Sequence, residues 1–273
     1  MNTSSSLTSK DWLKSAQNRL KSKGITSYNL DPIILLEDCL NIDRLRLLTR
    51  VLPLSQRQVN ILERNLSRRL KFEPLAYIRG FVEFYGRNFQ TNKGVLIPRP
   101  ESEAFIEIFR SAKINKFISV ADIGCGSGCI GITIKLEFPE TDVSLYDISP
   151  KALKLTAKNA DLLNAEVKVF KSNLLADLNN ECQIIVANLP YVPVNFDVNE
   201  DVNHEPYRAI YAGDSGLNYY KRLFMQLNLL EKKPLYILTE SLRTQHLLLQ
   251  KIAISSGYKL ITTNSLVQVY KRA

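Results

Sequence analysis

From residue 101 onwards, short apolar segments alternate with longer segments whose apolar residues recur at helical spacing. Such alternation is typical of strands and amphipathic helices that follow each other along a chain. The predicted strands are FISVADI (117–123), DVSLYD (142–147), VKVF (167–170), IIVAN (184–188), LYILTE (235–240), YKLIT (258–262) and LVQVY (266–270). The predicted helices cover 101–112, about 128–137, 149–164, about 215–230 and about 242–256.

This order of elements predicts an α/β fold: a doubly wound, mostly parallel seven-stranded sheet of Rossmann-like type with helices on both faces. Only a few residues join strands 258–262 and 266–270. A parallel pair needs a long crossover, so we expect these two strands to pair antiparallel at one edge of the sheet.

The first 70 residues repeat apolar positions at helical spacing without strands between them. Helices are predicted over 9–24, 31–40 and 55–70. We expect Asp31 to be the N-cap of the second helix and Ser55 to begin the third. The result is a small helical bundle with a thin core.

Residues 71–99 are rich in aromatic residues and glycine, with extended segments on either side of Gly86. This pattern predicts a β-hairpin linker followed by a loop at 98–100. The chain is therefore expected to have three parts: a helical domain (1–72), a β-hairpin linker (73–98) and an α/β domain (99–273).

Composition narrows the class of protein. The hydrophobic share of 45% is ordinary for a soluble globular protein. No apolar run reaches the roughly 18 residues of a membrane span, and the first residues lack the layout of a secretory signal. The four cysteines are scattered without the paired spacing of a metal site or a disulfide framework. We therefore expect a cytoplasmic protein that binds no metal and no membrane.

The net charge of +9 is concentrated near the N-terminus. Residues 1–80 hold 14 Lys/Arg and 7 Asp/Glu, whereas the rest of the chain holds 22 and 20. A basic helical domain is typical of proteins that bind an anionic partner, such as RNA, a ribosome or an acidic protein surface. The alternative explanation for this excess is that the basic side chains lie on helix faces that contact only solvent.

A glycine-rich turn follows the strand that ends near Asp122. The turn consists of Gly124, Cys125, Gly126, Ser127 and Gly128. Glycines at the carboxyl end of such a strand let the backbone approach a ligand closely. A dinucleotide fingerprint would need glycine where Cys129 stands, and a phosphate-binding P-loop would need Gly-Lys-Ser/Thr. The G-x-G-x-G spacing instead resembles the S-adenosylmethionine loop of class I methyltransferases; a purely structural turn is the alternative.

Two further positions suit the same cofactor. Asp147 ends the next strand, where a carboxylate can accept both ribose hydroxyl protons; it could equally be the N-cap of the helix that follows. After the third strand, Asn173 and Leu174 stand where such enzymes usually hold the adenine, the amide bonding the exocyclic amine and the leucine covering the ring.

The stretch IIVANLPYV (184–192) joins a predicted core strand directly to polar and aromatic residues. A turn would explain it, but at this sheet edge the residues also suit chemistry on a planar nitrogen. The Asn188 side chain and the Leu189 carbonyl can each accept one N–H of an amide or amine. Pro190 fixes the backbone, and Tyr191 can stack on the flat group. The methyl donor is already activated by its positive charge, so no strong base is needed.

A [D/N/S]-x-P-[Y/F] tetrapeptide after the fourth strand resembles the signature of methyltransferases that modify planar nitrogen. The segments EPLAYIRGFVEFYGRNF, VLIPRPESE (95–103) and HEPYRAIYAGDSGLNYYKRL resemble motifs of the HemK/PrmC family of peptide chain release factor glutamine methyltransferases. The similarity covers roughly residues 70–240, and the helical start matches that family's N-terminal domain in kind.

The resemblance implies that the protein methylates the side-chain amide of the Gln in the Gly-Gly-Gln loop of class I release factors. It implies S-adenosylmethionine as donor, S-adenosylhomocysteine as product and no requirement for nucleic acid. It also implies that Asn188 and Leu189 bind the glutamine while Tyr191 packs on it.

Three positions depart from the family pattern. Leu189 replaces a proline, Asn173 replaces an acid, and Glu240 is kept without the glycine-rich continuation that usually follows it. These departures put substrate preference and activity level in question.

Three alternatives to this function remain. Methylation of a ribosomal-protein glutamine would use a similar catalytic half. Methylation of an adenine exocyclic amine in RNA or DNA would suit Asn-Leu-Pro-Tyr, although the RNA adenine dimethyltransferases have their helical domain after the catalytic one. A binding module that kept only the fold would not need the glycine turn, Asp147 and Asn188 together.

Overall fold

The computed structural model describes residues 7–111, 118–178 and 181–273. The chain divides into two compact units: unit 1 comprises Met1–Gly80 and Asn199–His204, and unit 2 comprises Phe81–Val198 and Glu205–Ala273. Unit 1 is therefore discontinuous in sequence, because a short segment from the second half of the chain belongs to it. The ends of two predicted elements, Ala112 and Phe117, and the start of the chain lie outside the described residues.

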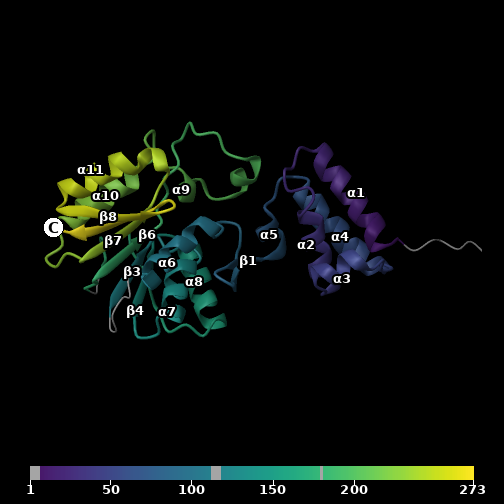
Figure 1. The fold of residues 1–273 in the computed structure, drawn as a ribbon, viewed down its shortest axis with the longest axis horizontal. Coiled ribbons are helices and arrows are strands. Elements are labelled where there is room, and N and C mark those ends of the chain that lie inside the picture. The colour runs from purple at the N-terminus through teal and green to yellow at the C-terminus, as the bar shows by residue number, and fades with distance from the viewer. Residues whose placement is uncertain (1–6, 112–117, 179–180) are drawn as a thin grey trace, which may run out of the picture. The chain divides into compact units, whose positions relative to one another are not determined.

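Unit 1 is a bundle of short helices, as its apolar pattern predicts (Figure 1). Its helices from the first 80 residues are α1 (Ser9–Ser22), α2 (Asp31–Leu40), α3 (Arg44–Thr49), α4 (Gln56–Arg69) and α5 (Leu75–Arg79). Trp12, Leu36 and Leu62 come from three different helices and are almost fully buried in one core. Ser55 caps α4 through a capping box with Gln58, so the predicted start of this helix is confirmed.

The prediction that Asp31 is an N-cap is wrong. Helix α2 already includes Asp31, and its N-cap, Leu30, makes no side-chain hydrogen bond. The Asp31 carboxylate instead accepts hydrogen bonds from Ser27 and from the buried Arg69, whose Nε lies 2.6 Å away. Long-range pairing with a buried guanidinium has overridden the local preference for capping.

Arg69 also binds the distant segment of unit 1. Its two Nη atoms donate to the carboxylate of Asp201 at 3.0 and 2.8 Å. Asp201 lies in the short 3₁₀ helix η2 (Glu200–His204), and His204 contacts the carbonyl of Lys71 at 2.9 Å. A charge buried to this degree must be paired, so Asp31 and Asp201 together satisfy Arg69.

The predicted linker contains both a helix and a hairpin. Residues 75–79 form α5, which ends at Gly80, so the first part of the linker is helical rather than extended. Strands β1 (Phe81–Phe84) and β2 (Arg87–Gln90) then pair antiparallel around Gly86, which confirms the hairpin.

Unit 2 is built on the predicted seven-stranded sheet, whose strand order is β5-β4-β3-β6-β7-β9-β8. Its strands are β3 (Ser119–Ile123), β4 (Asp142–Asp147), β5 (Lys168–Lys171), β6 (Ile184–Ala187), β7 (Tyr236–Glu240), β8 (Tyr258–Asn264) and β9 (Val267–Arg272). Strands β3 to β7 pair in parallel, and β9 pairs antiparallel with both β7 and β8. The expected mostly parallel sheet with an antiparallel edge is confirmed.

Helices cover both faces of the sheet (Figure 1). The helices of this unit are η1 (Pro100–Glu103), α6 (Ala104–Ser111), α7 (Cys129–Glu137), α8 (Pro150–Leu162), α9 (Tyr207–Ile210), α10 (Asn218–Leu227), η3 (Arg243–Gln245) and α11 (His246–Ser255). Side chains of β6 alternate between the two resulting cores: Ile184 and Val186 pack in the core beneath α6 and α7, and Ile185 packs beneath α10 and α11. This two-residue period explains why the buried strands read as continuous apolar runs.

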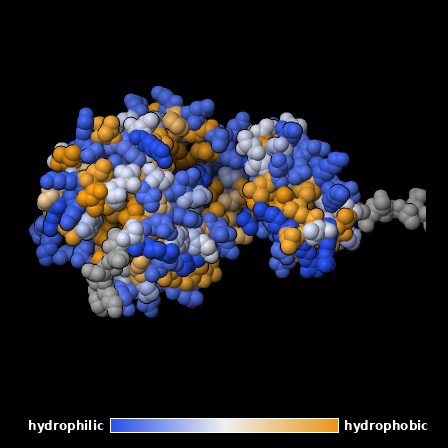
Figure 2. Space-filling view, in the orientation of Figure 1, coloured by the Kyte–Doolittle hydropathy of each residue, from blue (hydrophilic) through white to orange (hydrophobic). Residues whose placement is uncertain are grey.

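Large hydrophobic side chains also reach the surface. In unit 1 the most exposed of them are Leu45, Leu48 and Val51, and Figure 2 shows hydrophobic surface among the charged residues of this unit. No helix in the described ranges combines the length and apolar character needed to cross a bilayer.

Candidate functional site

The register of two central strands brings the glycine turn and the Asn-Leu-Pro-Tyr stretch together. Ile123, the last residue of β3, pairs with Ala187, the last residue of β6. The next residues, Gly124 and Asn188, therefore leave the sheet side by side at its carboxyl edge. A Cβ atom on Gly124 would lie 2.8 Å from Cδ2 of Leu189, so a larger residue there would require the Leu189 side chain to shift.

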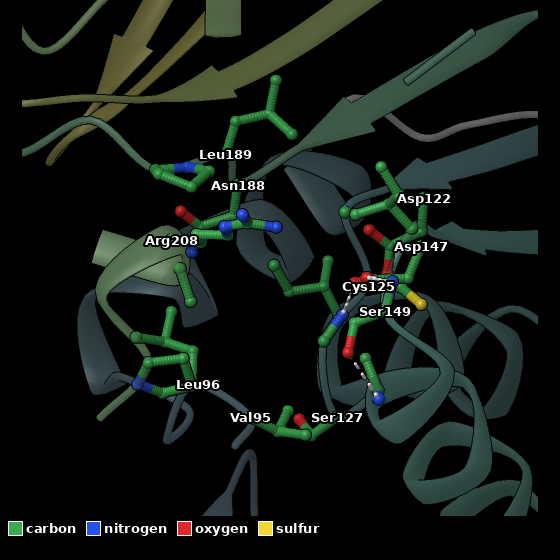
Figure 3. A pocket seen from close by; sticks show the side chains of 18 of the residues that line it. Val95, Leu96, Asp122, Cys125, Ser127, Asp147, Ser149, Asn188, Leu189 and Arg208 are labelled. Carbon is green, nitrogen blue, oxygen red and sulfur yellow. Dashed lines mark hydrogen bonds between the residues drawn. The ribbon is translucent and has the colours of Figure 1, made fainter. Parts of the chain in front are cut away.

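A cavity of about 580 Å³ opens at this edge, a typical size for a small-molecule site. Figure 3 shows Asn188 and Arg208 on one side of it and Cys125, Asp147 and Ser149 on the other. Of the residues predicted for the site, those that line the cavity are Gly124, Cys125, Gly126, Ser127, Asp147, Asn173, Leu174, Asn188, Leu189 and Pro190.

Asp147 holds the glycine turn and the start of α8. Its Oδ2 accepts the N–H of Gly126 at 3.0 Å, and its Oδ1 accepts the N–H of Ser149 at 2.8 Å. The N-cap of α8 is Ser149, so the alternative that assigned this role to Asp147 is wrong. Burial raises the pKa of the Asp147 carboxyl, and the backbone N–H groups oppose that rise. Each oxygen keeps a further lone pair that can face a ligand.

Asp122 lies one residue before the end of β3 and is almost fully buried. Its Oδ2 accepts the N–H of Gly131 in α7 at 2.9 Å. Burial raises the pKa of this carboxyl to about 7. Because of this raised pKa, the charge of Asp122, which also lines the cavity, changes near neutral pH.

Asn188 is oriented by a residue from another part of the chain. Its Nδ2 donates to Oγ of Ser102 in η1 at 2.8 Å. Oδ1 therefore stands on the opposite side of the carboxamide, where it can accept a hydrogen bond. The neighbouring backbone is held by the buried Tyr220, whose hydroxyl accepts the N–H of Leu189 at 3.3 Å and lies 3.0 Å from the carbonyl oxygen of Ala187.

Comparison with known proteins shows the family of the chain. A family model described as PrmC N-terminal domain matches residues 11–80, and one described as Methyltransferase small domain matches residues 100–207. The Koribacter versatilis release factor glutamine methyltransferase is 36% identical over 81% of this chain and 81% of its own length. The chain belongs to the release factor glutamine methyltransferase family. The Bacillus subtilis member is 34% identical over 84% of this chain and 83% of its own length.

A solved structure supports the fold. The hMettl16 catalytic domain, crystallised with an RNA hairpin, aligns with 82% of this chain and 84% of its own at a TM-score of 0.53 and 16% identity. At that identity the likeness shows a shared Rossmann-like architecture and carries no information about substrate. The chain is thus a methyltransferase by family, and its fold is Rossmann-like.

Two residues predicted for the site of this family member lie outside the cavity wall. Gly128 is the N-cap of α7, and a Cβ there would lie 2.8 Å from Ile132 and 2.9 Å from Thr156, so close packing explains the glycine. Tyr191 is partly buried and donates its hydroxyl to Oε1 of Glu240 at 2.9 Å. The stacking role of Tyr191 stays a prediction.

Asn173 has a polar partner that sequence analysis did not foresee. Its Oδ1 accepts a hydrogen bond from Arg222 of α10 at 3.0 Å, and its backbone carbonyl accepts one from Gln226 at 3.3 Å. Asn173 therefore lines the cavity with its side-chain oxygen already engaged. Its contact with the exocyclic amine of adenine stays a prediction.

Much of the cavity wall was missed by sequence reasoning. It comes from residues 94–99 with Ser102, from 206–209 with Arg222, and from the start of α8. Two of these segments overlap the motifs VLIPRPESE and HEPYRAIYAGDSG. The family resemblance was therefore based partly on these residues, but it assigned them no role in the site. Glu205 joins them: its carboxylate accepts the N–H of Ile97 at 2.9 Å and pairs with Arg99.

The cysteines at the site are buried and favour the thiol form. Cys125 and Cys129 are buried, and burial raises the pKa of both thiols, that of Cys129 to about 12. A thiolate nucleophile is therefore disfavoured here. A search of the described residues finds no group of three or more His, Cys, Asp or Glu placed to hold a metal ion.

Proposed function

We propose that this protein transfers a methyl group from S-adenosylmethionine to the side-chain amide nitrogen of the glutamine in the Gly-Gly-Gln loop of class I peptide chain release factors. Family membership supports the substrate, since the Koribacter and Bacillus relatives carry that name. The observation that carries the proposal is the pairing of Ile123 with Ala187, which sets the glycine turn beside Asn188.

The cavity residues fit S-adenosylmethionine. The carboxylates of Asp122 and Asp147 in its wall suit a cationic ligand with ribose hydroxyl groups. Gly124 and Gly126 have positive φ values of 74° and 61°, and without side chains they expose backbone to the cavity. Leu174 and Ile148 give apolar surface for a planar ring. We assign cofactor binding to residues 124–128, Asp147, Asn173, Leu174 and Asn188.

The residues at the end of β6 would hold the glutamine amide. S-adenosylmethionine supplies an activated methyl group on a positively charged sulfur. The amide nitrogen is a poor nucleophile, so its lone pair has to be aimed by acceptors for both N–H groups. Asn188 Oδ1 is one acceptor, because Nδ2 is given to Ser102, and the Leu189 carbonyl is the other. Pro190 fixes the backbone between them and Tyr191.

Positioning of this kind accounts for much of the catalysis. Fixed orientation of two reactants is worth up to roughly 7–11 kcal/mol of the barrier. The amide nitrogen would gain the methyl group as the bond between that carbon and sulfur breaks, which leaves S-adenosylhomocysteine, and the nitrogen would lose one proton to solvent water. A carbonyl oxygen can be supplied by leucine as well as by proline, so the replacement at position 189 leaves this chemistry possible.

Unit 1 is proposed to recognise the protein substrate. Its described residues include exposed basic side chains, among them Lys10, Lys14 and Arg57, which suit an acidic protein surface. We keep the division into a recognition domain (1–72), a linker (73–98) and a catalytic domain (99–273) as part of this proposal. Association with ribosomes and a cytoplasmic location belong to it as well.

The decisive experiment offers labelled S-adenosylmethionine to the protein with three acceptors: a class I release factor, ribosomal particles and RNA. Label should appear on the release factor and be lost when its Gly-Gly-Gln glutamine is replaced by alanine. Label on a ribosomal protein or on RNA instead would contradict the proposal and favour the corresponding alternative.

A further inference from the structure

Glu240 is the last residue of β7, and the sheet register places it next to the catalytic amide. Ala187 pairs with Thr239 in parallel β6 and β7, so Asn188 and Glu240 are the next residues on the two strands. Side chains alternate along strands, so both project to the same face. Glu240 is 1% exposed and does not line the cavity, so its side chain would not contact a ligand bound there.

Three polar side chains surround this carboxylate. Tyr191 donates its hydroxyl to Oε1 at 2.9 Å. Burial raises the pKa of Glu240, and the side chains of Ser102, Tyr191 and Asn188 lie close enough to oppose that rise. Oε2 is buried and, within the described residues, has no hydrogen-bonding partner of ordinary geometry. An unsatisfied buried carboxylate oxygen is costly, and the nearby Ser102 hydroxyl can rotate to satisfy it.

The direction of these hydrogen bonds decides how Asn188 faces the cavity. A carboxylate only accepts hydrogen bonds, so it draws the Ser102 proton toward itself. The Ser102 oxygen is then left to accept, and it accepts from Nδ2 of Asn188 at 2.8 Å. A carboxamide that donates on this side must present its oxygen on the other. A donor at position 240 would remove the constraint and permit the flipped amide, whose NH₂ group would meet the substrate N–H groups.

We propose that Glu240 is a positioning residue of the methyl-transfer site, which orients the Asn188 carboxamide through the Ser102 hydroxyl and holds Tyr191 by its own Oε1. The proposal deepens the proposed function and rests on it. The backbone of Glu240 is also linked to the end of β6. The Tyr220 hydroxyl lies 2.5 Å from the carbonyl oxygen of Glu240 and 3.0 Å from that of Ala187.

The test uses the full chain with Glu240→Gln, Ser102→Ala and the double variant, assayed on a class I release factor with labelled S-adenosylmethionine. Glu240→Gln keeps the shape of the side chain but replaces one acceptor by a donor. We expect kcat to fall about 10–100-fold in each single variant, as for other small misplacements of a reacting group, with cofactor affinity within about twofold of wild type. Because both act through one hydrogen bond, the double variant should be no worse than the poorer single one.

Glu137→Gln is the matched control. Glu137 is a partly buried carboxylate of the same unit that pairs with Arg87 and Arg110 away from the cavity, so its replacement should leave kcat unchanged. Melting temperatures separate catalysis from folding, and Ser102→Ala removes only one oxygen if Glu240→Gln folds poorly. Unchanged kcat in both single variants, or additive losses in the double variant, would overturn this inference alone. Failure of the wild type to label the release factor would overturn the proposed function and the inference with it.

Discussion

Cδ2 of Leu189 occupies the space next to Gly124, where a Cβ atom would lie only 2.8 Å away. The contact joins the turn proposed to hold the methyl donor to the stretch proposed to hold the glutamine. The two halves of the reaction are therefore in direct packing contact, and a change in either should be felt by the other.

Replacing Gly124 tests this contact. Gly124→Ala should cost about 1–2 kcal/mol of unfolding free energy for its positive φ, and in addition lower affinity for S-adenosylmethionine by displacing Leu189. Gly257→Ala is a matched control, because Gly257 has φ +84° but a Cβ atom added there would meet no atom within 4 Å. Calorimetric binding and denaturant unfolding of both variants separate the two effects. Equal cofactor affinity in the two variants would contradict the importance of the contact.

Replacing Asn188 separates binding of the donor from transfer. Asn188→Ala should lower kcat by about 10²-fold or more, because one acceptor that aims the amide is lost, while cofactor affinity stays within a few-fold. Asn264→Ala, at an exposed position of β8, serves as the control. Single-turnover kinetics and titration with S-adenosylmethionine measure the two quantities. A parallel loss of both would mean that Asn188 mainly holds the cofactor.

Charge reversal tests the role of unit 1. Lys10→Glu with Lys14→Glu, both exposed on α1, should raise KM for the release factor about tenfold at low salt, with little change in kcat. The same change at Lys251 and Lys259, exposed in unit 2, should have a smaller effect. Steady-state kinetics at two salt concentrations provide the measurement, since screening should reduce the difference. An unchanged KM would show that the basic bundle has another task.

Asp122 predicts how stability depends on pH. Its pKa is about 7 in the folded protein and about 3.9 in an unfolded chain. The folded state therefore binds the proton more tightly, so the stabilising contribution is full below pH 4 and is lost as pH rises through 7. Each unit of pKa difference corresponds to about 1.4 kcal/mol.

Asp122→Asn removes this titration while keeping an oxygen that can accept the N–H of Gly131. Relative to this variant, the wild type should lose unfolding free energy between about pH 4 and pH 7, as measured by denaturant unfolding. Asp142→Asn, at an exposed carboxylate paired with Lys168, is the control and should follow the wild type. Parallel pH profiles for wild type and Asp122→Asn would contradict the raised pKa.

Local patterns in the sequence were enough to predict most of the fold. The alternation of apolar strands and amphipathic helices predicted the seven-stranded sheet and its antiparallel edge, because burial on two faces leaves a direct mark on composition. The glycine turn and Asn188 could be predicted as neighbours, since both follow parallel strands at one sheet edge. Helix α5 was missed because its five residues are too short for a periodic signal.

Contacts between distant segments could not be predicted. Nothing near Asp31 in the sequence indicates that it binds Arg69 rather than capping its own helix. In the same way, Ser102 is separated from Asn188 by 86 residues, and only the folded chain makes it the partner of the amide. Residues that form a strand produce a repeating apolar pattern in the sequence. Residues that orient a functional group produce no such pattern.

The assignment of residues 199–204 to unit 1 has a consequence for building chimeras. An exchange of the first 80 residues alone for those of a relative would remove Arg69 and leave Asp201 facing a surface that did not evolve to bind it. A transplant that aims to change substrate choice must therefore carry two pieces of chain, and the second of them begins only a few residues after the Asn188–Tyr191 stretch.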